Sequence, residues 1–138
     1  MRSGIVIGLL LSGIALLVAC QSEDQLEFNR YYSNGRVVYQ SKCQNCHGAN
    51  GEGLQSLIPP LTDSVYLKAN KTTLACYLKY GLKGKINVSK KQFDGEMPAT
   101  GIADIHLAEV LTYINNSFGN KSGVVTTQMV NEDLSRCN

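Results

Sequence analysis

The chain has 138 residues, which is the length of one ordinary domain. Its 13 basic and 11 acidic side chains leave a formal net charge of +2, so bulk charge gives no case for nucleic-acid binding. Hydrophobic residues make up 43% of the sequence, as in soluble proteins, but three Phe, seven Tyr and no Trp predict a small protein core.

Residues 1–19 are predicted to be an export signal. Arg2 supplies a minimal positive region, and the apolar stretch Ile5 to Ala19 is short for a membrane span, which needs about 20 residues. Leu17-Val18-Ala19-Cys20 resembles a bacterial lipobox, whose cysteine is lipidated and becomes the first mature residue. The alternatives are an uncleaved anchor helix, or an ordinary cleavage site beside an unrelated cysteine. We expect lipidation of Cys20, and hence a domain anchored to a membrane outside the cytoplasm, on the periplasmic side or the cell surface.

Two helices are predicted to pack together near the ends of the mature chain. Residues 20–29 are polar and aperiodic and should form a tether, after which Arg30 to Gln44 has helical spacing. Gly35 costs a helix about 1 kcal/mol relative to Ala, and a close crossing by a second helix, Asp104 to Phe118, would explain it. Two independent amphipathic helices remain the alternative. The crossing would bring Gly35 and Tyr39 against Val110 and Tyr113.

The stretch Cys43-Gln44-Asn45-Cys46-His47 carries the strongest chemical signal. Two cysteines spaced to meet the two vinyl groups of haem, followed at once by histidine, form the pattern to which haem c is attached. Cys43 and Cys46 would form the thioethers, and His47 would ligate one face of the iron. A zinc site, a thioredoxin-type redox pair or a plain disulfide is each a weaker interpretation. Zinc would need a second ligand pair, the redox pair a preceding strand, and a disulfide leaves His47 unexplained.

The middle of the chain is predicted to be rich in loops. Residues 48–53 form a glycine-rich turn, and Pro59-Pro60-Leu61 lies in the loop that follows. Thr72 or Thr73 could cap a helix over Leu74 to Tyr80, with Gly81 ending it. Residues 81–101 read largely as loop.

Met97 is the candidate for the second axial ligand. An arbitrary Met is usually a core filler, but Met97 lies in a polar, turn-rich segment and is followed by the stiff Pro98. Fifty residues after His47, it is far enough along the chain to reach the opposite face of a haem. His106 would instead give a bis-His haem, but its place within the last helix favours a solvated residue.

These residues together resemble the monohaem class I cytochromes c, over about residues 31–120. The likeness comprises the Gly35/Tyr39 helix, the Cys43–His47 motif, Pro59-Pro60-Leu61, Met97-Pro98 and the last helix. It implies an all-α fold of three to five helices around one covalent haem c, with crossing N- and C-terminal helices. It also implies that the carbonyl of Pro59, which the spacing from His47 favours over that of the adjacent Pro60, accepts a hydrogen bond from the His47 ring. The cytochrome domain is therefore expected over residues 30–120.

A narrower likeness is to cytochrome domains linked to quinoprotein dehydrogenases, copper nitrite reductases and terminal oxidases. It rests on the segments 80–88, 93–98, 111–120 and 123–126. Ser89, where glycine is frequent, and Phe93, where tyrosine is common, depart from that pattern and weaken only the choice of partner.

Residues 121–138 are expected to form a C-terminal extension, helical in part. Outside the cytoplasm, Cys76 and Cys137 invite a disulfide that would pin the extension to the Leu74–Tyr80 helix. The alternative is a buried thiol at Cys76 and a loose one in the tail.

Charge is unevenly spread along the sequence. No acidic residue lies between Asp63 and Asp94, whereas residues 94–109 hold four acids and no Lys or Arg. The first stretch is either an ordinary solvated face or a basic patch that steers an acidic redox partner. Its lysines are Lys68, Lys71, Lys79, Lys83, Lys85, Lys90 and Lys91.

The function that follows is electron transfer, not enzymatic turnover. Iron held by His47 and Met97 would have no open position for a substrate, so it could only gain and lose one electron. Partners would be a dehydrogenase, oxidase or reductase, and the membrane through the lipid anchor, with no role for nucleic acid. The alternatives are a fixed haem subunit of a larger oxidoreductase, or a haem peroxidase or gas-binding protein. The latter two would need a vacant sixth position.

Overall fold

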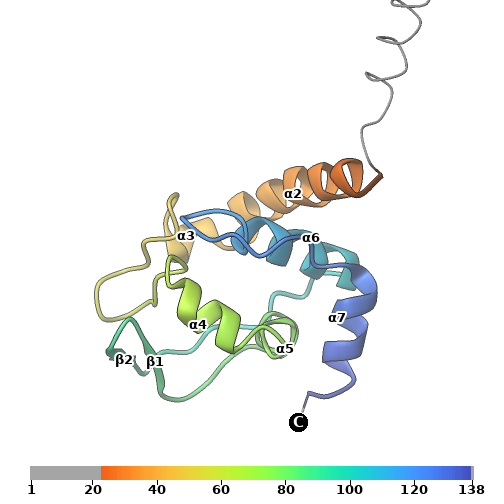
Figure 1. The fold of residues 1–138 in the computed structure, drawn as a ribbon. Coiled ribbons are helices and arrows are strands. Elements are labelled where there is room, and N and C mark those ends of the chain that lie inside the picture. The colour runs from red at the N-terminus through yellow and green to blue at the C-terminus, as the bar shows by residue number, and fades with distance from the viewer. Residues whose placement is uncertain (1–22, 138) are drawn as a thin grey trace, which may run out of the picture.

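The computed structural model describes residues 23–137. Six helices, one more than the three to five expected, are the main regular structure of this part, with one antiparallel pair of short strands, so the predicted all-α fold is confirmed (Figure 1). None of these helices is both long enough and apolar enough to span a membrane. The elements are α2 (Glu23–Lys42), α3 (Gln44–His47), α4 (Ser64–Ala69), α5 (Leu74–Tyr80), β1 (Ile86–Val88), β2 (Lys91–Phe93), α6 (Asp104–Ile114) and α7 (Thr127–Leu134).

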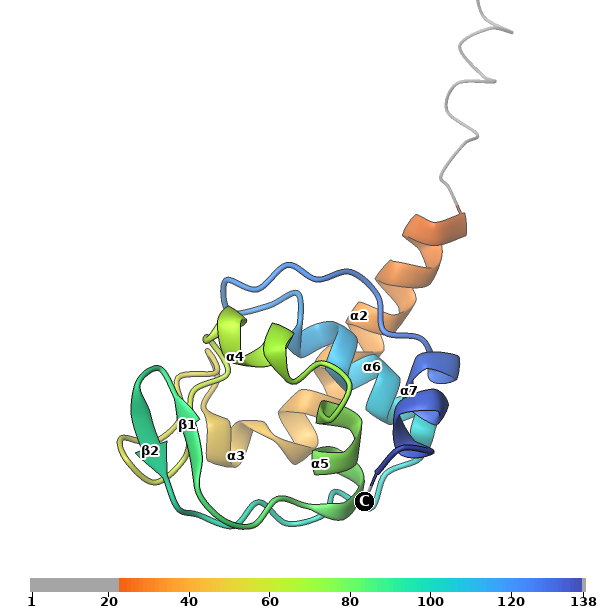
Figure 2. The same cartoon turned by 60° about the horizontal axis from the view of Figure 1, so that its bottom comes forward.

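Helix α2 begins earlier than predicted. Residues 23–29 were expected to be an irregular tether, but they form the first two turns of α2, which extend beyond the body of the protein (Figures 1 and 2). Glu23 and Asp24 lie in the first turn, where their negative charges interact favourably with the positive end of the helix dipole and stabilise the helix. Phe28 stacks on Tyr32 one turn later, with ring centroids 5.7 Å apart. Cys20 lies outside the described residues.

The predicted crossing of the terminal helices is confirmed, between α2 and α6. A Cβ on Gly35 would overlap the backbone carbonyl of Glu109, so only glycine allows this approach. Tyr39, buried to 1% exposure, packs on Tyr113 of α6 with ring centroids 5.3 Å apart. Phe118 packs on both rings, so Tyr39, Tyr113 and Phe118 form an aromatic cluster at the crossing of the two helices.

Two short helices follow the haem motif, and only α5 was predicted. Asp63 caps α4: its Oδ1 accepts hydrogen bonds from the backbone N–H groups of Val65 and Tyr66, both at 3.0 Å. Thr73 occupies the cap position of α5, but its hydroxyl donates to the Asn70 carbonyl at 2.9 Å instead of capping the helix. Gly81 ends α5 as expected, at φ +85°.

A β-hairpin interrupts the segment predicted to be loop. Ile86 pairs with Phe93, and Val88 with Lys91, around a two-residue turn. Both turn residues have positive φ, 51° at Ser89 and 63° at Lys90, the turn geometry that matches the twist of paired strands but usually needs Gly or Asn. Ser89 tolerates it because its N–H and its hydroxyl both donate to Asp63 Oδ2, at 2.8 and 3.0 Å. A glycine could not supply the second of these bonds.

Helix α7 lies within residues 121–138 and packs on α6 and α5. Val130 of α7 is fully buried in the core. Thr112 of α6 holds the segment before α7, since its hydroxyl accepts from the N–H of Val125 at 2.9 Å. Cys76 and Cys137 form a disulfide, with Cα atoms 5.8 Å apart, that ties the end of the extension to α5.

Candidate haem-binding site

Helix α3 is a single turn that presents the histidine. The N–H of His47 donates to the carbonyl of Cys43 at 2.9 Å, which places both residues on the same side of the turn. Both are buried, whereas Cys46 is exposed. The hydroxyl of Tyr39 donates to the carbonyl of Gly48 at 2.6 Å and so ties the end of α3 to the aromatic cluster.

The His47 ring is oriented by the loop that follows. Its Nδ1 lies 3.1 Å from the carbonyl oxygen of Pro59. The hydrogen-bond partner is therefore Pro59, not the adjacent Pro60. Burial lowers the pKa of His47, while the bond to Pro59 opposes this shift. A neutral imidazole that donates Nδ1–H to Pro59 keeps the lone pair of Nε2 for a metal.

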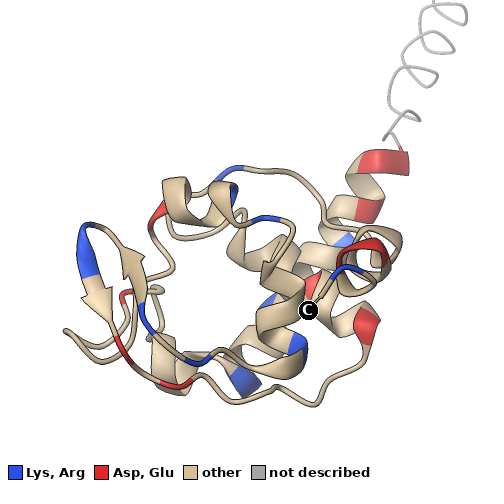
Figure 3. Ribbon diagram, turned by 90° about the horizontal axis from the view of Figure 1, so that it is seen from below, with Lys and Arg blue, Asp and Glu red and all other residues tan. Residues whose placement is uncertain are grey.

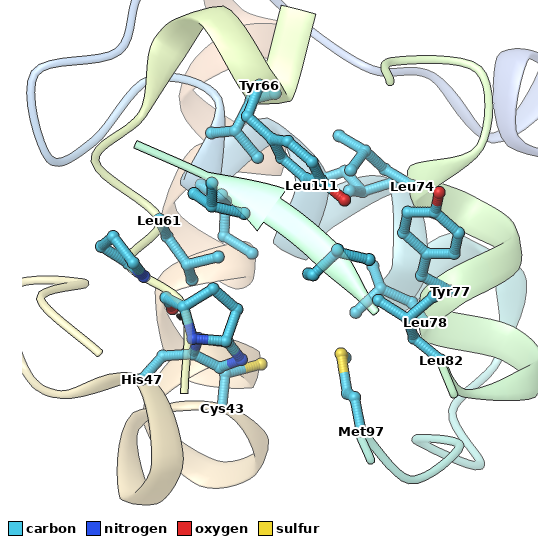
Figure 4. A pocket seen from close by; sticks show the side chains of 16 residues that line it. Cys43, His47, Leu61, Tyr66, Leu74, Tyr77, Leu78, Leu82, Met97 and Leu111 are labelled. Carbon is cyan, nitrogen blue, oxygen red and sulfur yellow. Dashed lines mark hydrogen bonds between the residues drawn. The ribbon is translucent and has the colours of Figure 1, made fainter. Parts of the chain in front are cut away.

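An apolar cavity opens beside Cys43 and His47 (Figure 4). Its lining residues come from α3, α4, α5, α6 and β1 and from the loops between them. Figure 2 shows these elements arranged in a ring. Apart from Cys43, His47, Met97 and two tyrosines, the side chains that line the cavity are hydrocarbon. The lining residues include Pro59, Leu61, Tyr66, Leu67, Leu74, Tyr77, Leu78, Leu82, Ile86, Val88, Leu111 and Ile114.

Met97 lines the same cavity from the side opposite His47, with its sulfur directed inward (Figure 4). Its backbone is fixed by an isolated antiparallel bridge to Leu82, with N–H to carbonyl distances of 2.8 and 2.9 Å. Gly81 permits this pairing, because a Cβ there would lie 2.7 Å from the carbonyl oxygen of Met97. The residue after α5 therefore determines where the methionine sits.

The two motif cysteines are free thiols, in contrast to the bonded pair Cys76 and Cys137. Burial, and secondly the neighbouring Cys46, raise the pKa of Cys43 to about 11, so its sulfur is held as a neutral thiol. Cys46 lines two adjoining hollows that also contain His47 and Met97. Two free thiols and a neutral imidazole beside an apolar cavity are the features that haem c attachment requires, and the thioether of Met97 lines the same cavity.

The alternative ligand sets are not supported. His106 lies on α6 away from the cavity, where its Nδ1 is 2.7 Å from Glu109 Oε2 and its side chain is half exposed. Residues 23–137 contain no cluster of three or more His, Cys, Asp or Glu side chains suited to a bare metal ion. Met129 is exposed on α7.

Tyr66 and Tyr77 are site residues that the sequence did not reveal. Both line the cavity (Figure 4), and burial, followed by the proximity of Tyr77, raises the pKa of Tyr66. Tyr66 was not singled out because no helix was predicted between Leu61 and Thr72. The signal that could have revealed it is Asp63 as a helix cap, with Tyr66 and Leu67 following on one face.

Charges that are separated in the sequence are mixed in the structure. Lys79 pairs with Asp104 at 2.6 Å and Lys83 with Glu96 at 2.9 Å, because the acidic segment folds back beside the lysines. Figure 3 marks the positions of the basic and acidic residues along the ribbon. The remaining members of the predicted basic stretch are exposed and form no ion pair with any described residue: Lys68, Lys71, Lys85, Lys90 and Lys91.

A family model for cytochrome c matches residues 32–118. The chain belongs to the cytochrome c family. One cytochrome c-552 of Thermus thermophilus is 29% identical over 129 residues, which cover 90% of this chain and 77% of that protein. A further Thermus thermophilus cytochrome c-552 is 30% identical over 97 residues, covering 67% of this chain and 73% of its own length. Haem c, covalently bound, is the cofactor of this family, so the chain is an electron-transfer haem protein.

Proposed function

We propose that this cytochrome is a membrane-anchored carrier that passes single electrons outside the cytoplasm in a respiratory or dehydrogenase chain. The observation that carries the proposal is the opposed placement of His47 and Met97 across one apolar cavity. This geometry supports an iron with both axial positions filled by protein. Such an iron has no position for a substrate, which favours a carrier over a peroxidase or a gas-binding protein.

When bound, haem c supplies one iron that alternates between the ferric and ferrous states. The surrounding residues set the conditions for that exchange. The Pro59 carbonyl holds the Nδ1 proton of His47 and strengthens the ring as a donor. The Met97 thioether, a soft and neutral group, favours the ferrous state and so raises the potential. The apolar walls exclude water from the site.

Replacing Met97 tests the ligand assignment. We expect Met97→Ala to lose the weak far-red absorption band of ferric methionine-ligated haem, to bind carbon monoxide in the ferrous state and to lower the reduction potential. Met129→Ala is the matched control, because Met129 is exposed on α7 and should change none of these. Wild-type protein that lacks the band and binds carbon monoxide readily would overturn the carrier assignment.

The membrane anchor is part of the proposal and rests on Cys20. Since α2 begins at Glu23, a lipid on Cys20 would hold the haem domain close to the bilayer, which suits exchange with membrane-bound dehydrogenases, oxidases or reductases. Cys20→Ser should move the haem-loaded protein from the membrane fraction to the soluble fraction. A variant that stays in the membrane would contradict lipidation.

The partner surface is proposed to be the five unpaired lysines. They are exposed and positively charged, so they would attract an acidic partner over about one Debye length, some 8 Å at physiological salt. Association with the partner should slow as ionic strength rises. Association rates that do not depend on salt concentration would show that the lysines do not steer the partner.

A further inference from the structure

The turn after α6 reaches back to the loop that holds His47. Two successive residues with positive φ, 58° at Phe118 and 90° at Gly119, reverse the chain there. Phe118 is not glycine, so this turn needs contacts that hold it. The turn places Asn120 in the interior of the protein, with only 3% of its surface exposed.

Asn120 is bonded directly to the loop of residues 48–61. Its Nδ2 donates to the carbonyl of Leu61 at 2.8 Å and to that of Ile114, at the end of α6, at 3.1 Å. Two carbonyl partners require the NH₂ group on this side, so the orientation of the amide is determined. Its Oδ1 is buried without a hydrogen-bond partner among the described residues. A buried acceptor without a partner is rare in proteins. Here the two hydrogen bonds donated by Nδ2 offset the cost of leaving Oδ1 unpaired.

The same turn contacts the loop at a second point. The ring of Phe118 packs so closely on Gly51 that a Cβ there would lie 2.6 Å from it. Gly51 and Leu61 are themselves joined, because the N–H of Leu61 donates to the Gly51 carbonyl at 2.7 Å. Phe118 and Asn120 therefore hold the two ends of one closed loop.

That loop touches His47 in two places. The N–H of Gly53 donates to the His47 carbonyl at 2.8 Å, and the Pro59 carbonyl accepts from the ring at 3.1 Å. Leu61 follows Pro59 by two residues, and the intervening Pro60 has its φ fixed by its ring. One fewer torsion is therefore free between the two carbonyls, so holding the carbonyl of Leu61 restricts the movement of that of Pro59.

We propose that Asn120 is a positioning residue that sets the donor strength of His47 through Leu61 and Pro59. The proposal rests on the proposed function, in which His47 is an axial ligand. A firm bond to Pro59 makes the imidazole more basic and stabilises ferric iron. Loss of the Asn120 bonds loosens the Pro59 carbonyl, weakens the donor and raises the reduction potential.

The test compares two asparagines of the same turn in the haem-loaded protein. Asn116 is the control: its Nδ2 donates to the carbonyls of Thr112 and Gly123, both at 2.7 Å, so its bonds lie within α6 and the segment after it. We expect Asn120→Ala to shift the ferric/ferrous equilibrium at least threefold toward ferrous, about 28 mV at 59 mV per decade. Hydrogen exchange at His47 Nδ1 should also become faster. Asn116→Ala should lower the unfolding midpoint but change neither quantity.

Asn120→Ser keeps a hydroxyl donor and leaves a smaller void than Asn120→Ala does. It therefore tests the proposal if Asn120→Ala fails to fold. It should give a smaller shift of the same sign. Unchanged potential and exchange in both Asn120 variants, or equal changes in Asn116→Ala, would overturn the proposal. The wild-type spectrum distinguishes this from failure of the proposed function, because absence of methionine and histidine ligation would be visible before any substitution is made.

Discussion

Gly35→Ala tests the packing of α2 on α6, which holds the frame around the haem-binding site. The added Cβ would overlap the carbonyl oxygen of Glu109 and lie 2.9 Å from Tyr113 Cβ. The overlapped atom belongs to the backbone of a buried helix, so no side chain can rotate away to make room. The two helices must therefore move apart at their point of closest contact.

Two opposing effects set the size of the change. Alanine is the better helix former, which stabilises α2 by about 1 kcal/mol. Overpacking a well-packed interior costs about 1–3 kcal/mol, and contact with rigid backbone puts this site at or beyond the upper end of that range. We expect a net loss of about 2 kcal/mol in the free energy of unfolding. With a urea m-value of about 2 kcal/mol/M, the unfolding midpoint would fall by about 1 M.

The assay is urea unfolding of the haem-loaded protein, followed by far-ultraviolet circular dichroism. Val37→Ala is the matched control, because Val37 lies on the same helix with 64% of its surface exposed and should leave the midpoint almost unchanged. A Gly35→Ala midpoint equal to or above that of the wild type would mean that helix propensity outweighs the crossing. The close contact with Glu109 would then not limit the approach of the two helices.

Two further predictions concern the disulfide and a capping carboxylate. Replacing Cys76 and Cys137 together with alanine should cost about 4 kcal/mol, from the entropy of a loop closed over 61 residues, and an unchanged urea midpoint would contradict it. Asp63→Ala should cost about 1–2 kcal/mol at neutral pH. The hydrogen bond from Tyr66, then those from Ser89 and Val65, hold the pKa of Asp63 below its usual value, against burial. The ionised Asp63 therefore stabilises the fold above about pH 4, and this stabilisation is lost as the pH falls further. The difference in unfolding free energy between the wild type and Asp63→Ala should shrink in acid. A difference that does not depend on pH would contradict this prediction.

The parts of the site that sequence predicted are those determined by local covalent structure. The spacing of Cys43, Cys46 and His47 follows from the dimensions of haem, so it is visible in five consecutive residues. Gly35 was informative for a similar reason, since a glycine in a good helix needs an explanation and a close crossing provides one. The first inference needed only five consecutive residues, whereas the second also needed a helix pattern elsewhere in the chain, over Asp104 to Phe118.

The hairpin could not be predicted in this way. Turns of its kind are recognised by Asn or Gly at positive φ, and this one has Ser89 and Lys90. What makes Ser89 acceptable is Asp63, which is 26 residues earlier in the chain and also caps α4. One carboxylate therefore accounts for both missed elements, and neither is apparent until the other is known.

Met97 lies between these cases. Its chemistry, and its place in a polar segment before Pro98, predicted that it faces the haem site, which required no knowledge of the fold. Its position depends on two hydrogen bonds to Leu82 and on the missing Cβ of Gly81, which join it to the end of α5. Sequence thus predicted the candidate ligand but not what holds it. A substitution at Gly81 should consequently disturb the methionine side of the haem while leaving the His47 side, held by Pro59, intact.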